Sequence, residues 1–164
     1  MKTKKTVKVR PKLLAICVGV VFVWALWFYR AEHQVARAHQ RLISAVESRN
    51  WGKIQTITSD DFMAGVYNKE ESIALGQEVL RPFLSLQIAE SEEVWVRERP
   101  RLYVRNALIR MDGKGMGYAD MVLSAVNTQT EPFVFTWQRM SRKPWDWKLI
   151  RVEHPLLNAH YASP

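Results

Sequence analysis

The stretch FTWQRMSRKPWDWKLIRVE (residues 135–153) predicts two β-strands joined by a tight turn. In its second half Trp145, Trp147 and Leu149 fall on one face of an extended chain, and Ile150 and Val152 fall on the other. Residues 142–144 (RKP) carry the turn signal between the two strands.

The β pattern begins near residue 87 and continues to residue 153. Residues 102–111 are rich in β-forming residues, and residues 112–115 (DGKG) predict a hairpin turn after them. Further strands are predicted at residues 116–126 and 133–140. This part of the chain therefore predicts a meander of long antiparallel strands.

Helical patterns precede the strands. Apolar residues recur at helical spacing in one segment that ends near Asn50, namely at Val35, Ala38, Leu42 and Val46. The chain then predicts a short helix at 51–58, a turn at 59–62, a short strand at 63–67 and a helix at 69–84 capped by Asn68. Helices followed by strands predict an α+β domain, with three helices packed on one face of a curved sheet.

A separate segment precedes this domain. Residues 13–29 (LLAICVGVVFVWALWFY) carry no charge, and as a helix they span roughly 26 Å, close to the thickness of a bilayer core. Residues 1–12 hold six Lys and Arg and no acidic residue, so they predict a cytoplasmic N-terminus. We therefore expect a single-pass inner-membrane protein whose domain, residues 30–155, lies outside the cytoplasm, in the periplasm of a bacterium. Residues 156–164 form a C-terminal tail.

A cleaved signal peptide is the alternative to a retained anchor. Residues 23–25 (VWA) fit a cleavage site, but the apolar run continues beyond them to Tyr29. We favour the anchor, which makes the lipid bilayer a partner of residues 13–29. Cys17 is the only cysteine and lies inside the apolar run, so no disulfide forms within one chain.

The formal charge of +8 is concentrated in the tail. Residues 13–164 hold 18 Lys and Arg against 16 Asp and Glu. A nucleic-acid-binding domain is expected to carry a basic face. The nearly neutral domain therefore argues against a nucleic-acid partner.

Two segments resemble a known superfamily. LISAVESRNWGKIQTITSDDF (residues 42–62) is similar to the opening of nuclear transport factor 2-like proteins, also called ketosteroid isomerase-like or SnoaL-like. Residues 135–153 resemble the last two strands of the same superfamily, in which a Trp opens the final strand. The resemblance implies that Trp147 is largely buried in the core. The resemblance covers roughly residues 35–153. It implies a cystatin-like cone, in which a strongly bent antiparallel sheet wraps around helices and leaves a pocket at its open end.

The resemblance also directs attention to acids and tyrosines inside the cone. On the predicted strand 116–126, Tyr118 and Asp120 point to the same side. If that side is concave, Asp120 is a candidate acid–base carboxyl and Tyr118 a candidate donor; if it is convex, both face solvent. The first helix places Leu42 and Val46 where related isomerases offer a Tyr, which weakens the enzyme interpretation.

Tyr103, Trp137 and Trp147 are candidates for the wall of a ligand pocket, with core packing as the alternative. The four His residues show no metal-ligand spacing, so we expect no metal and no cofactor. The glycines at 113, 115 and 117 imitate a phosphate loop, but they join predicted strands, which favours a hairpin.

Three kinds of function stay open. The first is a membrane-anchored, non-catalytic scaffold, assembly or ligand-binding module, and a separate one is a carrier of lipids or hydrophobic metabolites. The alternative is a small-molecule isomerase, dehydratase or hydrolase with an acid–base site in the cone. The predicted strands carry apolar residues on both faces, so we expect a homodimer or a partner in a membrane complex.

Overall fold

The computed structural model describes Gly19 and residues 30–158, and the predicted anchor, residues 13–29, therefore lies outside the described residues except for Gly19. No helix in this described part is long and apolar enough to span a bilayer. Residues 30–158 form eleven elements in this order: α2 (Ala31–Glu47), α3 (Trp51–Ile57), β1 (Thr58–Ala64), β2 (Tyr67–Asn68), α4 (Lys69–Leu80), β3 (Phe83–Arg99), β4 (Leu102–Gly115), α5 (Ala119–Asn127), β5 (Phe133–Arg139), β6 (Trp147–Glu153) and α6 (Pro155–Asn158).

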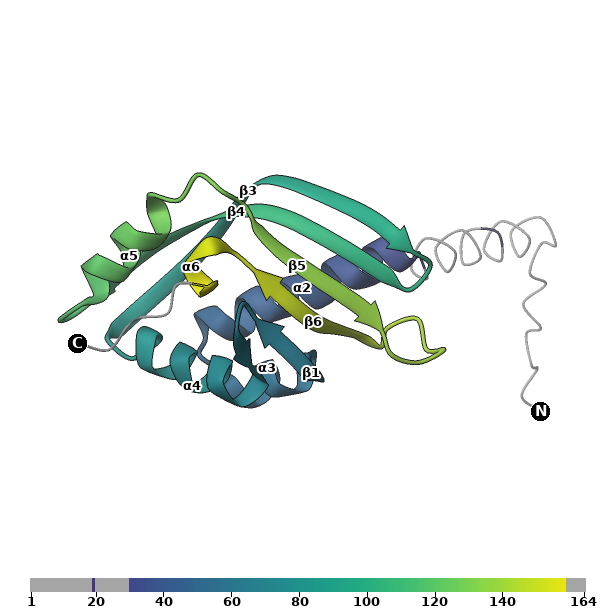
Figure 1. Cartoon of the computed structure of the whole chain (residues 1–164), viewed down its shortest axis with the longest axis horizontal. Coiled ribbons are helices and arrows are strands. Elements are labelled where there is room, and N and C mark those ends of the chain that lie inside the picture. Colours follow the sequence, from purple (N-terminus) through teal and green to yellow (C-terminus); the bar gives the residue numbers. More distant parts are fainter. Residues whose placement is uncertain (1–18, 20–29, 159–164) are drawn as a thin grey trace, which may run out of the picture.

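The strands form one curved sheet of six strands in the order β2-β1-β6-β5-β4-β3. The long β3–β4 hairpin and β5 cross over α2, so the sheet bends around the helix (Figure 1). The expectation of an α+β domain is confirmed. The expectation of a purely antiparallel sheet is wrong, because β1 pairs with β6 in parallel. Six elements, from β2 to β5, lie between β1 and β6 along the chain, so the pairing joins distant segments.

The helical predictions are confirmed in place, with small shifts in their ends. Helix α2 ends at Glu47, and Arg49 then adopts a left-handed conformation with φ of 52°. Its guanidinium donates to the carbonyl oxygens of Phe83 and Leu84, which fixes this turn against β3. Asn68 caps α4 as predicted, since its side chain accepts from the backbone N–H of Glu71.

The predicted turn at residues 59–62 and the predicted end of the helix at residues 69–84 are wrong. Residues 59–62 form part of β1, where Phe62 is buried and the acidic pair Asp60 and Asp61 is exposed at an irregularity between β1 and β6. Helix α4 ends at Leu80 rather than residue 84, because Pro82 follows and cannot donate a backbone hydrogen bond.

The largest error concerns residues 112–126. Strand β4 runs through the predicted turn to Gly115, and a side chain at Gly113 would lie 2.4 Å from the carbonyl oxygen of Ser85. These glycines therefore permit close approach between β3 and β4. The chain turns afterwards, at Gly117 with φ of 64°, and residues 119–127 form helix α5 instead of a strand.

The core lies between α2 and the concave face of the sheet. Trp137 is fully buried and Trp147 is 3% exposed, so the expectation of a buried Trp147 is confirmed. The Trp147 ring meets Tyr103 edge-on, with centroids 5.4 Å apart, and its Nε1–H donates to the carbonyl oxygen of Pro144. This packing fills the end of the cone nearest to the start of α2.

Candidate ligand-binding cavity

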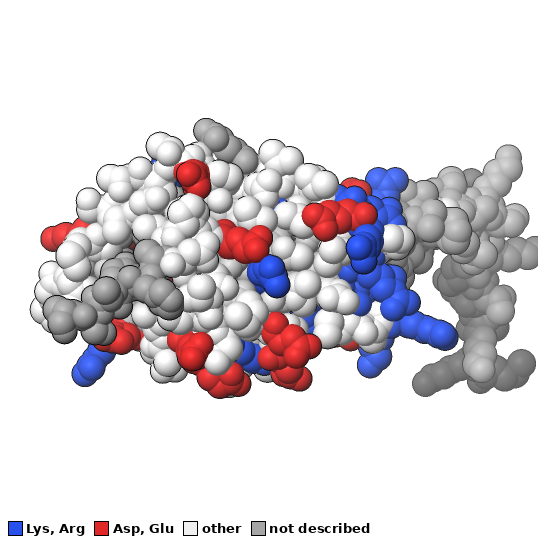
Figure 2. All heavy atoms as spheres, in the orientation of Figure 1, with Lys and Arg blue, Asp and Glu red and all other residues white. Residues whose placement is uncertain are grey.

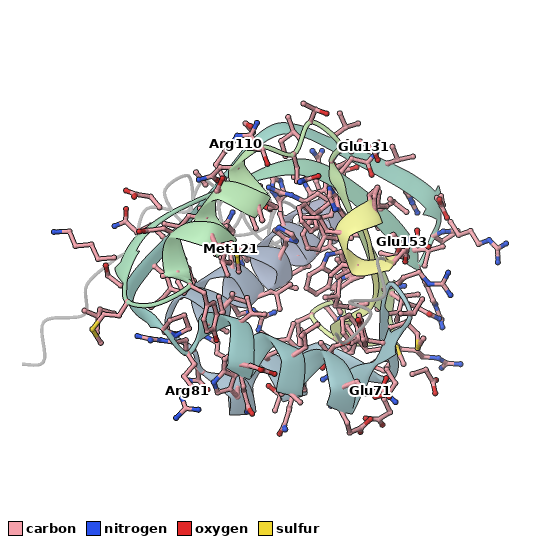
Figure 3. All side chains as sticks on the ribbon, turned by 60° about the vertical axis from the view of Figure 1, so that its left-hand side comes forward. Glu71, Arg81, Arg110, Met121, Glu131 and Glu153 are labelled. Carbon is pink, nitrogen blue, oxygen red and sulfur yellow. The ribbon has the colours of Figure 1, made fainter. Side chains whose placement is uncertain are left out.

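The other end of the cone contains a cavity of about 440 Å³. Side chains from α2, α3, α4, α5 and α6 line it together with the inner face of the sheet. Figure 3 views this end, with α4, α5 and α6 arranged around it and the labelled charged residues Glu71, Arg81 and Arg110 at the outer edge of the molecule. The cavity therefore occupies the open end of the cone.

The wall of this cavity is almost entirely apolar. None of the described side chains that line it is charged or is an imidazole, and hydroxyl groups occur only at Thr58, Tyr67 and Ser72. Thr58 Oγ1 donates to the carbonyl oxygen of Ile54 at 3.0 Å, and Ser72 Oγ donates to that of Asn68 at 2.6 Å. Since these two hydroxyl protons are used within the backbone, the wall offers contact area rather than polar recognition.

A buried polar network lies behind the cavity floor. Glu90 accepts from His39 Nε2 and from Arg105 Nη2, each at 2.6 Å, and all three side chains are at most 5% exposed. The Arg105 guanidinium also lies 4.9 Å from the centre of the Trp95 ring. The carboxylate thereby accepts two short hydrogen bonds in a region that is nearly closed to solvent.

Phe135 separates His39 from the cavity. Its ring lines the cavity and meets the imidazole edge-on, with centroids 4.8 Å apart. His39 Nδ1 is buried and has no hydrogen-bond partner within residues 30–158. The network therefore holds α2 against β3 and β4 and does not present a titratable group to the cavity.

Sequence reasoning did not find this network. Glu90 lies 51 positions after His39 and 15 positions before Arg105 in the sequence. A signal existed only for His39, which lies one position after Ala38 on the apolar stripe of the first helix. Charged residues in strands β3 and β4 give no periodic signal that would pair them.

The candidate catalytic residues lie outside the cavity. Tyr118 precedes α5 and is 41% exposed, and its hydroxyl donates to the carbonyl oxygen of Glu78. Asp120 lies in the first turn of α5 and is exposed. Because these residues belong to a turn and a helix rather than to one strand, they do not share the face that the sequence predicted.

The candidate pocket residues occupy the filled end of the cone. Trp137, Tyr103 and Trp147 are at most 3% exposed, and none of them lines the apolar cavity. Burial raises the pKa of the Tyr103 phenol above its ordinary value, while Arg97 lowers it. As for metals, the part of the chain that the structure describes contains no group of three or more potential ligands.

Comparison with known proteins identifies the fold. No family model matches the chain, and no curated protein matches it. Among solved structures, Bd1075 of Bdellovibrio bacteriovorus aligns with a TM-score of 0.56 and 14% identity over 74% of this chain. The present chain covers only 40% of the Bd1075 chain.

Two further structures cover most of both chains. An NTF2-like protein of Cytophaga hutchinsonii aligns with a TM-score of 0.51 and 16% identity over 72% of this chain and 91% of its own. A Nostoc punctiforme protein with a cystatin-like fold aligns with a TM-score of 0.53 and 8% identity over 74% of this chain and 86% of its own. The domain thus has an NTF2-like, cystatin-like fold, and at these identities the likeness concerns the fold alone.

Proposed function

We propose that this chain is a membrane-anchored, non-catalytic module that binds an apolar ligand in the cone, outside the cytoplasm. The observation that carries the proposal is the cavity of about 440 Å³ with its uncharged wall. Burying apolar ligand surface there contributes roughly 25 cal/mol per Å², without any directional polar contact. A lipid acyl chain or a hydrophobic metabolite has the matching chemistry.

The enzyme alternative has less support. An acid–base reaction needs a titratable group within hydrogen-bond reach of the substrate. Among the described residues, His39 and Glu90 bond to each other behind Phe135, and neither lines the cavity. His154 stacks on Phe133 behind the wall, and its ring nitrogens are bonded to the backbone of Glu131 and Leu156. The alternative would require a movement of Phe135 or Phe133 that opens one of these imidazoles to the cavity.

Membrane anchoring through residues 13–29 is the second part of the proposal. The uncharged segment follows six basic residues, and α2 begins directly after it at Ala31. A reporter that is active only outside the cytoplasm, fused after Pro164, should be active. An inactive reporter on a well-expressed fusion would contradict this topology.

The binding proposal is tested by mass spectrometry of molecules that copurify with the full chain. Ala125 lines the cavity and is exposed on α5, so Ala125→Trp should fill the entrance with an indole ring. Ser124→Trp places the same ring on the neighbouring exposed position, which does not line the cavity. The wild-type chain and Ser124→Trp should retain an apolar molecule that Ala125→Trp loses. Identical extracts from all three proteins would contradict the proposal.

A scaffold role is a second candidate, favoured by exposed apolar residues near the cone opening. Leu84, Met116 and Met121 are each 68% exposed. Side chains of this kind are suited to contact a second copy or a partner in a membrane complex. Mass spectrometry of proteins that copurify with the full chain should identify that partner, and substitution of Met121 by Glu should release it.

A further inference from the structure

The end of the domain at which α2 begins carries a concentration of positive charge. Lys and Arg side chains gather there, while most Asp and Glu side chains lie over the rest of the visible face (Figure 2). We call this end the basal face and define it by the seven basic residues Arg30, Arg97, Arg99, Arg101, Arg139, Arg142 and Lys143.

Hydrogen bonds and strand pairing bring these residues together. Arg99 and Arg101 flank the β3–β4 turn, and Arg142 and Lys143 lie in the β5–β6 turn. The backbone N–H of Arg139 donates to the carbonyl oxygen of Arg101 at 3.0 Å, which places the two turns side by side. The basal face is therefore formed by two adjacent turns and the start of α2.

The charge of the basal face differs in sign from that of the remaining domain. Its seven basic residues stand against three acidic residues at the same end, Glu32, Glu98 and Asp146. The rest of residues 30–158 holds 11 basic and 13 acidic residues. Such a separation gives a nearly neutral domain one strongly positive end.

Two apolar side chains stand among these charges. Trp145 is 53% exposed and Met140 is 48% exposed, and both belong to the segment between β5 and β6. Trp145 also lines a groove with Arg37 and Arg41 on the exposed side of α2. An exposed Trp among Arg and Lys is the composition found where proteins meet the headgroup layer of a bilayer.

From these observations we infer that the basal face docks on the anionic phospholipid surface of the membrane that holds the anchor. The inference rests on the proposed anchor, because residue 30 follows the uncharged segment directly and brings the basal face to the bilayer. Arg and Lys would contact lipid phosphates, and Trp145 would enter the headgroup layer. Docking in this way turns the cavity at the opposite end of the cone away from the membrane.

The test uses the full chain in lipid nanodiscs, with a Cys17→Ala background. A bimane fluorophore is attached at Ser141→Cys in the β5–β6 turn or, as a control, at Ser124→Cys on α5 at the other end of the domain. Nanodiscs contain phosphatidylcholine with a nitroxide on its headgroup, either alone or together with phosphatidylglycerol. Bimane at position 141 should be quenched when phosphatidylglycerol is present, and high salt should reverse the quenching. Bimane at position 124 should stay unquenched in nanodiscs with and without phosphatidylglycerol.

A charge variant makes the test specific. Four exposed residues of the basal face are replaced by Gln: Arg99, Arg101, Arg142 and Lys143. Its matched control replaces four exposed basic residues elsewhere: Lys53, Arg81, Lys114 and Arg151. The first variant should lose the quenching at position 141, and the second should keep it, with equal melting temperatures confirming that both fold.

Equal quenching with and without phosphatidylglycerol, or quenching that survives the basal substitutions, would overturn the inference. The inference would also be overturned if the basal variant lost a copurifying acidic protein while its quenching stayed unchanged. The basal face would then bind a protein rather than the lipid surface. A chain that does not enter nanodiscs would refute the proposed anchor, and the docking with it. A chain that inserts and is not quenched would refute the docking alone.

Discussion

The two ends of the cone are built on the same strands but packed in opposite ways. At the closed end, near the start of α2, Trp137, Trp147 and Tyr103 fill the space, and the side chains of the Glu90 network are at most 5% exposed. At the open end, near α4, α5 and α6, the wall encloses a cavity. The comparison indicates that the closed end determines stability, while the open end is available for a ligand.

Large residues account for this difference. The strand residues that face inward at the closed end are aromatic, and their rings meet one another and His39 edge-on. The inward residues at the open end are mostly aliphatic, such as Ile88, Ile109 and Val152, and they do not reach the helices across the space. Smaller side chains on a sheet that keeps its curvature leave a void.

The largest expected effect follows from breaking the buried network at the closed end. Arg105→Leu leaves the Glu90 carboxylate buried without its cation, so we expect a loss of about 3–5 kcal/mol in the free energy of unfolding. Arg151→Leu, in an exposed pair with Glu153, should cost less than about 1 kcal/mol. Urea unfolding of residues 31–164 measures both variants. Similar losses for the two would show that the network does not stabilise the closed end.

Removing an aromatic ring from the closed end should have an effect of similar size. Trp147→Ala deletes a ring that is 3% exposed, and we expect a cost of about 3–5 kcal/mol. Trp145→Ala removes the same side chain from a 53% exposed position and should change stability by less than about 0.5 kcal/mol. Thermal unfolding distinguishes them, and an unchanged melting temperature for Trp147→Ala would contradict the packing described above.

The same substitution at both ends tests the comparison directly. Val35→Ala removes methyl groups from a fully buried position of α2 and should cost roughly 2 kcal/mol. Val122→Ala on α5 removes methyl groups from a half-buried position, where part of their surface faces the cavity, and should cost roughly half as much. Equal costs in urea unfolding would mean that the open end is packed as densely as the closed end.

The smallest effect concerns alkaline pH. Because burial raises the pKa of Tyr103, the folded state holds this proton more tightly than the unfolded chain does. The contribution of the protonated Tyr103 phenol to stability is complete below about pH 10, the ordinary pKa of Tyr. It is lost as pH rises through the raised pKa of the folded state. Tyr103→Phe should therefore flatten the fall in melting temperature above pH 10. An unchanged alkaline slope would contradict the assignment of that fall to Tyr103.

Local sequence patterns predicted the fold in segments whose apolar residues recur with one clear period, either helical or alternating. The helical spacing from Val35 to Val46, the cap at Asn68 and the alternation of Trp147 with Leu149 have counterparts in the structure. The alternation is wrong at its ends, because Trp145 lies outside β6 and is exposed, and Val152 lines the cavity together with Leu149. Residues 116–126 were assigned to a strand because Met, Val and Leu suit both helices and strands in a short apolar run. The parallel pairing of β1 with β6 depends on contacts across the chain, which no local pattern carries.

The candidate site was less predictable than the fold. The aromatic residues Tyr103, Trp137 and Trp147 suggested a pocket wall, but the structure places them in the filled core. The cavity is the space that the side chains of the helices and the sheet leave unfilled. A space of this kind between aliphatic residues such as Val79 and Val126 has no signal in the sequence. The Glu90 network joins residues from α2, β3 and β4 and follows only from the tertiary arrangement.

The most direct test of the central claim is photocrosslinking of the full chain in membranes with a diazirine-bearing fatty acid. Peptides from the cavity wall, especially those around Ile73 on α4 and Val126 on α5, should carry the adduct. Ala125→Trp should abolish these adducts and Ser124→Trp should preserve them, while labelling of residues 13–29 by membrane-dissolved probe should be the same in all three proteins. Adducts confined to residues 13–29, or wall adducts that persist in Ala125→Trp, would contradict a ligand-binding cavity.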